Sequence, residues 1–336
     1  MEFEFAPMEG ITGYVYRKAH HQYFYGITEY YTPFITPNQT RKLTSREMED
    51  VRPENNEGME VVPQILTNKA DDFLWAAEKL KQMGYERVNL NLGCPSGTVV
   101  TKYRGSGFLS RPVSLDSFFG EVSEGLEKLS MKLSVKTRIG MTDPEEFEDI
   151  LSIYNKYPME KLIIHPRLQK DYYKNKPDME TFQYAAENSI HSVCYNGDLF
   201  SKEKVEDFSQ KFPQIQWVMM GRGMLTNPFL AEELTVGKEG CSHPAPPTVG
   251  SEEYRKRLLE FHRALSDGYS QVMSGDRNVL FKLKELWFYF AFLFEGEEKL
   301  LKKIKKAQKM AEFQAVAQEL FVNGAMKEQP EFKGWD

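Results

Sequence analysis

The segment Arg87-Val-Asn-Leu-Asn-Leu-Gly-Cys-Pro-Ser96 alternates polar and apolar residues before it reaches Gly93, Cys94 and Pro95. Alternation of this kind is typical of a β-strand. Pro95 ends the strand because proline has no backbone N–H to donate to a neighbouring strand. The thiol of Cys94 is therefore expected at a fixed point beside the end of a strand, where it is a candidate for catalysis.

Seven other short strands are predicted in the first 221 residues, and helical patterns separate several of them. The eight strands are expected at 3–6, 27–34, 61–66, 87–92, 133–138, 161–165, 192–196 and 217–221, with helices at 69–83, 115–129, 144–157, 179–188 and 202–212. Alternating strands and helices predict a parallel sheet. Eight repeats predict an α/β fold, the (β/α)₈ TIM barrel, whose catalytic residues lie at the carboxyl ends of the strands.

The composition changes after the predicted barrel. Residues 236–251 are rich in Gly, Pro and Ser, which is typical of a linker, and residues 252–324 carry helical patterns with few strand signals. We therefore expect two domains, a catalytic barrel at 1–240 and an all-α helical domain at 251–336.

The overall composition predicts a cytoplasmic protein. The 336 residues are 41 % hydrophobic, enough for a sizeable core, and their formal net charge is −6. The three cysteines show neither a disulfide framework nor a zinc spacing, which fits a reducing compartment and predicts no metal site. No signal peptide is expected, and no apolar run approaches the ~18 residues of a membrane span. Any contact with nucleic acid must therefore use a local basic patch.

Polar residues and glycines follow the predicted strands, and in a barrel all of them face one mouth. Lys136 and His165 stand within apolar strands, where a charge is costly unless something pairs with it. This pattern favours a binding site over a set of simple turns.

Glycines near the last two predicted strands indicate an anion site. Gly197, Gly221 and Gly223 let backbone amides approach an anion closely, and Arg222 can neutralise its charge. Barrels often bind phosphate with the loops after these two strands. Since no G-x-G-x-x-G follows a strand, a mononucleotide such as FMN is expected here rather than a dinucleotide held by a Rossmann motif.

Six ordered segments resemble motifs of the tRNA-dihydrouridine synthase family. They lie at 6–17, 89–96, 134–138, 164–167, 195–198 and 220–223, and the first reads Ala6-Pro-Met-Glu-Gly-Ile-Thr-Gly-Tyr-Val-Tyr-Arg17. The resemblance implies a flavin-dependent oxidoreductase that reduces the C5=C6 bond of a uridine in tRNA, with FMN as cofactor and NADPH as transient reductant. The sequence departs from the family pattern at Gly97, Gly107 and Leu168, near the expected substrate side.

The resemblance also implies roles for individual residues. Cys94 is expected to donate a proton to uracil C5, since a thiol with a pKa near ~8.5 stays mostly protonated at pH 7, and Asn91 is expected to position the uracil. Lys136 is the expected cation beside the N1–C2=O edge of the flavin. The expected cofactor-binding residues are Pro7, Met8, Gln64, Lys136, His165, Arg167, Asn196, Gly197, Asp198, Gly221 and Arg222.

A run of basic residues near the C-terminus favours RNA binding over a merely solvated helix face, because the protein as a whole is acidic. In one helix over 299–309, Leu300 and Ile304 would share a buried face and the lysines would cover the opposite face. The expected RNA-binding residues are Lys299, Lys302, Lys303, Lys305, Lys306 and Lys309.

Two other functions stay open at this point. One is a flavin-dependent reductase of a free pyrimidine or another small unsaturated ring, which a barrel alone does not exclude. The other is a non-catalytic RNA-binding protein with a vestigial flavin site, although Cys94 together with Asn91, Lys136 and His165 argues against it. The helical region and its lysines favour RNA, because a small substrate needs neither. The sequence leaves open whether tRNA or ribosomal RNA is the target.

Overall fold

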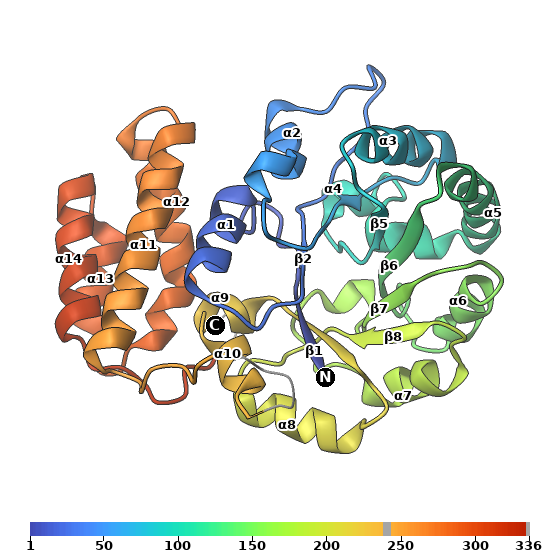
Figure 1. Ribbon diagram of the computed structural model, residues 1–336. Helices are drawn as coiled ribbons and strands as arrows, with labels where there is room; N and C mark the ends of the chain where they lie inside the picture. Colours follow the sequence, from blue (N-terminus) through green and yellow to red (C-terminus); the bar gives the residue numbers. More distant parts are fainter. Residues whose placement is uncertain (238–242, 334–336) are drawn as a thin grey trace. The chain divides into compact units, whose positions relative to one another are not determined.

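The computed structural model describes residues 1–237 and 243–333 (Figure 1). Its strands form one sheet in the order β3-β2-β1-β9-β8-β7-β6-β5-β4, with parallel registers between neighbours. The strands are β1 (Glu2–Phe5), β2 (Glu29–Tyr31), β3 (Val61–Val62), β4 (Gln64–Ile65), β5 (Arg87–Leu92), β6 (Lys132–Arg138), β7 (Lys161–His165), β8 (Ser192–Tyr195) and β9 (Trp217–Met220).

The segments β3 and β4 are two halves of one barrel strand, separated only by Pro63. Proline interrupts the strand because it lacks a backbone N–H, yet its carbonyl accepts a 2.9 Å hydrogen bond from the Asn89 amide. Because β3 pairs with β2 and β4 pairs with β5, the sheet closes on itself. The predicted (β/α)₈ barrel is therefore confirmed. The strands β5 and β7 have the predicted bounds, and β2 is shorter than the predicted 27–34.

The chain divides into two compact units, and the first comprises residues 1–14, 28–198 and 211–219. It contains the barrel and helices that surround it (Figure 1). These helices are α2 (Ser45–Val51), η1 (Pro53–Asn55), α3 (Ala70–Gln82), α4 (Gly97–Val100), η2 (Gly105–Ser110), α5 (Pro112–Leu129), α6 (Glu146–Tyr154), η3 (Gln169–Asp171) and α7 (Met179–Asn188). Their apolar faces pack together, as where the rings of Phe73 and Phe118 join α3 to α5 at 5.8 Å.

The second unit comprises residues 15–27, 199–210 and 220–336. Its helices are α1 (Tyr14–Tyr23), α8 (Lys202–Lys211), α9 (Arg222–Thr226), α10 (Leu230–Thr235), α11 (Glu252–Val272), α12 (Asp276–Phe290), η4 (Ala291–Leu293), α13 (Glu298–Lys306) and α14 (Met310–Asn323). The helical C-terminal region expected from the sequence is thus confirmed. The domain boundaries at 1–240 and 251–336 stay a prediction, and part of the expected linker lies outside the described residues.

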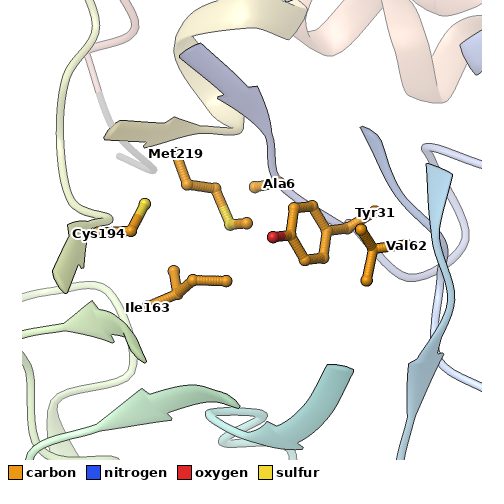
Figure 2. Close-up of a cluster of buried hydrophobic side chains, with 6 residues drawn as sticks. All are labelled: Ala6, Tyr31, Val62, Ile163, Cys194 and Met219. Atoms are coloured by element: carbon orange, nitrogen blue, oxygen red, sulfur yellow. The ribbon is translucent and has the colours of Figure 1, made fainter. Parts of the chain in front are cut away.

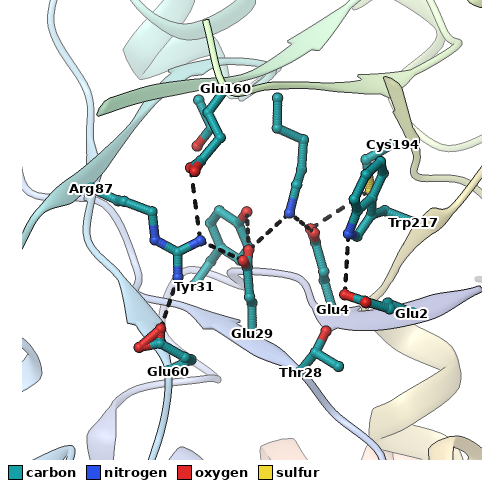
Figure 3. A network of polar contacts seen from close by, with 12 residues as sticks. Glu2, Glu4, Thr28, Glu29, Tyr31, Glu60, Arg87, Glu160, Cys194 and Trp217 are labelled. Atoms are coloured by element: carbon teal, nitrogen blue, oxygen red, sulfur yellow. Dashed lines mark hydrogen bonds and ion pairs between the residues drawn. The ribbon is translucent and has the colours of Figure 1, made fainter. Parts of the chain in front are cut away.

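Side chains fill the barrel interior in layers, and β7 shows their order because alternate residues of a strand face the same side. Ile163 lies in a buried apolar cluster with Tyr31 and Met219 (Figure 2). Two residues earlier, Lys161 forms ion pairs with Glu4 and Glu29 at the amino ends of the strands, and Figure 3 shows these two carboxylates. Two residues later, His165 stands at the carboxyl end of β7, where the candidate site lies.

Candidate active site

Cys94 lies two residues after the end of β5, and hydrogen bonds fix its backbone on both sides. Its amide donates to Asn91 Oδ1 at 2.9 Å, and its carbonyl accepts from Ser106 N at 3.1 Å and Oγ at 2.8 Å. Gly105 has a positive φ of 55°, and a Cβ there would lie 2.8 Å from the Cys94 carbonyl oxygen. Only glycine therefore allows the following loop to approach this closely.

The thiol of Cys94 is half-buried, and burial raises its pKa above the ordinary value. A backbone hydrogen bond at Ser96 and the positive charges of Arg138 and Lys136 act in the opposite direction without reversing the shift. Because burial disfavours the thiolate, the thiol keeps its proton at neutral pH.

A chain of amide side chains holds Asn91 in one orientation. Asn91 Nδ2 donates to Gln64 Oε1 at 2.7 Å, and Gln64 Nε2 donates to Asn89 Oδ1 at 2.7 Å. Asn89 Nδ2 donates in turn to Ser134 Oγ at 2.8 Å.

The direction of this amide chain follows from the backbone at its end. The Gly93 and Cys94 amides can only donate, so the atom of Asn91 that they contact must be Oδ1. Asn91 Nδ2 must then face Gln64 Oε1, and the same logic fixes Gln64 and Asn89. Asn91 therefore orients the Cys94 loop, and one of its N–H groups takes no part in these bonds. Asn89 and Ser134 support the orientation of Asn91 through Gln64.

Lys136 lies on β6 directly opposite Asn91 of β5. Its side chain is half-buried, and no described residue forms a hydrogen bond or ion pair with its ammonium group. Burial, and then the nearby charge of Arg138, lower the pKa of Lys136 to about 8. A cation in the barrel interior with no partner among the described residues suits an anionic ligand. Lys136 is therefore compatible with a bound flavin that carries negative charge.

Arg167 joins two other predicted residues. Its guanidinium forms a bidentate ion pair with Asp198, in which Nη1 lies 2.9 Å from Oδ1 and Nη2 contacts Oδ2. Nη1 also lies 2.9 Å from His165 Nε2. Since a guanidinium only donates, Nε2 of His165 accepts and the ring is neutral. Arg167 and Asp198 thus neutralise each other. The ion pair fixes the guanidinium of Arg167, which in turn orients His165.

Arg138 is the last residue of β6 and has no role predicted from the sequence, yet it connects the two loops beside Cys94. It is fully buried, and its guanidinium donates to the carbonyl oxygens of Gly93 at 3.0 Å, Leu168 at 2.7 Å and Tyr172 at 2.6 Å. Gln169 adds a 3.3 Å hydrogen bond from Nε2 to the Pro95 carbonyl. The loop after β7 is therefore fixed to the loop that carries the cysteine.

The remaining predicted cofactor residues are not joined to Cys94 by hydrogen bonds that the structure describes. Asn196 Nδ2 donates to the Met219 carbonyl at 2.7 Å, and a Cβ on Gly197 would lie 2.6 Å from Tyr195 Oη. Pro7 and Met8 follow β1, and the Met8 amide donates to Thr12 Oγ1 at 2.8 Å.

Gly221 and Arg222 belong to the second unit. Gly221 is the residue before α9, and the guanidinium of Arg222 lies over the rings of Phe200 at 5.0 Å and Phe332 at 5.1 Å. Their expected role in phosphate binding stays a prediction.

The lysine-rich segment differs from the single helix predicted over 299–309. The helix α13 ends at Lys306, and α14 begins at Met310. Lys284 Nζ donates to the carbonyls of Lys305, at 3.0 Å, and Ala307, which satisfies groups that a helix end leaves free. All six predicted lysines are exposed, and Ile304 is buried as expected. Five of them lie on α13, and Lys309 is the residue before α14.

The chain matches the family model described as "Dihydrouridine synthase (Dus)" over residues 4–325. A probable tRNA-dihydrouridine synthase of Staphylococcus aureus (strain COL) is 26 % identical over 334 residues, which cover 94 % of this chain and 92 % of that protein. Probable tRNA-dihydrouridine synthase 2 of Bacillus subtilis (strain 168) is 25 % identical over 285 residues, 80 % of this chain and 79 % of that one.

Solved structures share the fold at low sequence identity. A morphinone reductase mutant in complex with tetrahydroNAD has a TM-score of 0.50 and 12 % identity, covering 70 % of this chain and 86 % of that one. A 2-naphthoyl-CoA reductase complex has a TM-score of 0.55 and 10 % identity, covering 70 % of this chain and 50 % of that one. Across residues 1–237 and 243–333, no helix has the length and apolar character needed to cross a membrane.

Proposed function

Since the chain belongs to the dihydrouridine synthase family, we propose that it reduces the C5=C6 bond of a uridine in tRNA, with FMN as cofactor, NADPH as reductant and Cys94 as proton donor. The observation that carries the proposal is the arrangement at the end of β5. A protonated thiol is held there by Asn91, and Lys136 lies opposite Asn91 with no protein partner among the described residues.

The residues at this end of the barrel suit FMN. Bound FMN would supply the hydride that reduces the pyrimidine ring. Lys136 would hold the flavin through its charge, and Gln64 would contribute the hydrogen-bonding capacity that its two bonds to Asn89 and Asn91 leave over. His165 would stand beside the flavin in the orientation that the contact of its Nε2 with Arg167 gives it.

Cys94 would deliver the proton from Sγ to uracil C5. Burial keeps this proton on the sulfur before the reaction, because it raises the pKa of the thiol. The charges of Arg138 and Lys136 favour the thiolate, so they stabilise Cys94 after the proton has left. The same site thus holds the proton and tolerates its loss.

The exposed lysines of α13 and Lys309 are proposed to contact RNA phosphates, since they form a local basic patch on an acidic protein. A cytoplasmic location is proposed with them, because tRNA modification takes place where the RNA is.

The test compares wild-type protein with Cys94→Ala, both loaded with FMN and supplied with NADPH. Unmodified tRNA transcript and free uridine are offered separately, and mass spectrometry measures the gain of two hydrogen atoms. We expect product on tRNA alone, and a loss of about 10²–10⁴-fold in rate for Cys94→Ala, as for other positioned general acids. Flavin content and flavin reduction by NADPH should be unchanged in the variant.

Three results would contradict the proposal in different ways. Product on free uridine but not on tRNA would favour a small-molecule reductase. RNA binding without product or flavin would favour the non-catalytic alternative. Normal product formation by Cys94→Ala would place the proton donor elsewhere.

A further inference from the structure

Three exposed tyrosines lie on the two loops beside Cys94. Tyr103, which follows α4, is 45 % exposed, and Tyr172 and Tyr173, in the loop after β7, are 45 % and 46 % exposed. Among the described Phe, Tyr and Trp side chains, only Phe281 is also exposed to this degree. A single exposed aromatic ring needs no explanation, but three on the loops next to one candidate site are a feature that a binding partner would account for. We call Tyr103, Tyr172 and Tyr173 the tyrosine rim.

Two of these tyrosines have backbone conformations that side chains disfavour. Only four described non-glycine residues have positive φ, and they include Tyr103 at 52° and Tyr172 at 51°. Tyr172 has a ψ of −95°, close to a turn position that glycine dominates. Strain of this kind at an exposed position does not improve folding, which favours a role in binding.

The surroundings of the tyrosine rim are basic. The segment 97–111 contains three basic residues, Lys102, Arg104 and Arg111, and no acidic residue. Lys170, Lys174 and Lys176 are exposed around the other two tyrosines and outnumber the acidic residues of this loop, Asp171 and Asp178. Because the whole chain has a net charge of −6, these loops differ in sign from the average surface. A polyanion that carries flat rings is the partner that such a surface complements.

The rim is held next to the candidate catalytic thiol. The guanidinium of Arg138 bonds the carbonyl oxygens of both Gly93 and Tyr172, and the ring of Tyr173 lies 5.4 Å from the same guanidinium and 6.0 Å from the ring of His165. On the other loop, Ser106 bonds the Cys94 carbonyl three residues after Tyr103. The tyrosines are therefore placed by the same bonds that place Cys94.

We propose that the tyrosine rim is a stacking platform for single-stranded RNA, which receives the bases next to the uridine that enters the site. The inference rests on the proposed function, because a uridine must leave its stack to reach Cys94 and its neighbours then lose a stacking partner. Tyrosine rings replace that partner without reading sequence, and the lysines hold the adjoining phosphates.

The test measures binding of an unmodified tRNA transcript and of single-stranded oligouridylate to FMN-loaded protein. In the variant Tyr103→Ala/Tyr172→Ala we expect oligouridylate affinity to fall about tenfold or more, since each stacked base contributes substantially. Tyr103→Phe/Tyr172→Phe keeps both rings and should bind like the wild type. Ile190→Ala removes an exposed apolar side chain that precedes β8, at the opposite end of the barrel, and serves as control.

The salt dependence separates stacking from charge. The alanine variant should keep the wild-type slope, whereas Lys170→Gln/Lys174→Gln should lower the log–log slope by about 0.7 for each phosphate that is no longer neutralised. Flavin content and flavin reduction by NADPH should be normal in every variant, which excludes misfolding.

Wild-type affinity in the alanine variant would overturn the tyrosine rim and leave the proposed function intact. An equal loss in the phenylalanine variant would also overturn it, because the hydroxyl groups and not the rings would then bind the RNA. If the wild-type protein bound neither the tRNA transcript nor oligouridylate, both the proposed role of the tyrosine rim and the proposed function would be wrong.

Discussion

Residues at the candidate site differ in how many of their hydrogen-bonding groups the protein itself uses. Asn91 Oδ1 accepts from the Gly93 and Cys94 amides, and one N–H of Asn91 donates to Gln64. Most of its hydrogen-bonding groups are therefore used within the protein. Lys136 is the opposite case, because no described residue pairs with it. One residue is therefore an internal support, and the other is available to a ligand.

Asn91 can be tested by thiol reactivity. Asn91→Asp keeps the acceptor for the Cys94 amide and adds a negative charge, which should raise the thiol pKa and slow alkylation of Cys94 by iodoacetamide. Asn91→Ala leaves two amides without an acceptor, which loosens the loop and should speed alkylation. Peptide mass spectrometry assigns the reaction to Cys94. If Cys94 were alkylated at the wild-type rate in both variants, Asn91 would not hold the loop.

Lys136 can be tested by the pH dependence of FMN binding. Its pKa is lowered to about 8, so the ammonium form that attracts an anion predominates below pH 8 and is lost as pH rises. FMN affinity should therefore fall as pH rises through about 8 in the wild type. Lys136→Met should bind more weakly, with a flat profile. Flavin fluorescence titration measures both, and parallel profiles would assign the titration to another group.

At the scale of elements, ion pairs connect four strands at the amino end of the barrel (Figure 3). Lys161 of β7 bonds Glu4 of β1 and lies 3.0 Å from Glu29 of β2, which also bonds Arg87 of β5. Burial raises the pKa of Glu4 to about 7. Residues at this face of a barrel serve stability, so the network is a structural feature and separate from the candidate site.

Lys161→Met should destabilise the protein by about 1 kcal/mol more near pH 8 than near pH 5, because it leaves Glu4 buried without its cation and protonation of a group with a pKa of about 7 limits the penalty. Glu4 has a folded pKa above its unfolded value, so the loss should grow as pH rises from about 5 to 8 and shrink when Glu4 is protonated. Urea unfolding at the two pH values measures this. The double variant Glu4→Gln/Lys161→Met should recover most of the stability, and a pH-independent loss would exclude Glu4 as the cause.

At the scale of the whole molecule, positive charge is concentrated although the chain is acidic. The net charge is −6, yet α13 carries five exposed lysines, and Lys309 adds a sixth just before α14. Ile304 on the other face of α13 is buried, so substitutions of the lysines should leave the helix folded.

Replacing Lys302, Lys303, Lys305 and Lys306 with Gln should weaken tRNA binding and lower the log–log salt slope by roughly 0.7–0.9 for each phosphate that is no longer neutralised. A matched control replaces Lys79, Lys128, Lys132 and Lys156, which lie on the surface of the barrel unit, and changes the net charge equally. Equal slopes in the two variants would show that only net charge matters, and α13 would then be a solvated face.

The sequence by itself was sufficient to predict eight barrel strands and their order along the chain, although β2 is shorter than predicted and Pro63 divides one predicted strand into β3 and β4. Alternation of polar and apolar residues predicted the bounds of β5, and the short apolar run at 161–165 predicted those of β7, because both signals are local to the strand. The same alternation places Asn89 on the face of Asn91, so this support could have been found from the sequence. The ordered motifs were also sufficient to indicate the family to which the chain belongs.

Only the tertiary structure decided which groups neutralise one another and which stay available. Gln64 and Asn91 are 27 residues apart, Arg167 and Asp198 are 31 apart, and Arg138 and Gly93 are 45 apart. The carbonyls of Lys305 and Ala307, where α13 ends, likewise accept from Lys284 of another helix. Hydrogen bonds and ion pairs of this kind form only at about 3 Å. The pattern of residues within one segment does not indicate which distant segment will bring a partner that close.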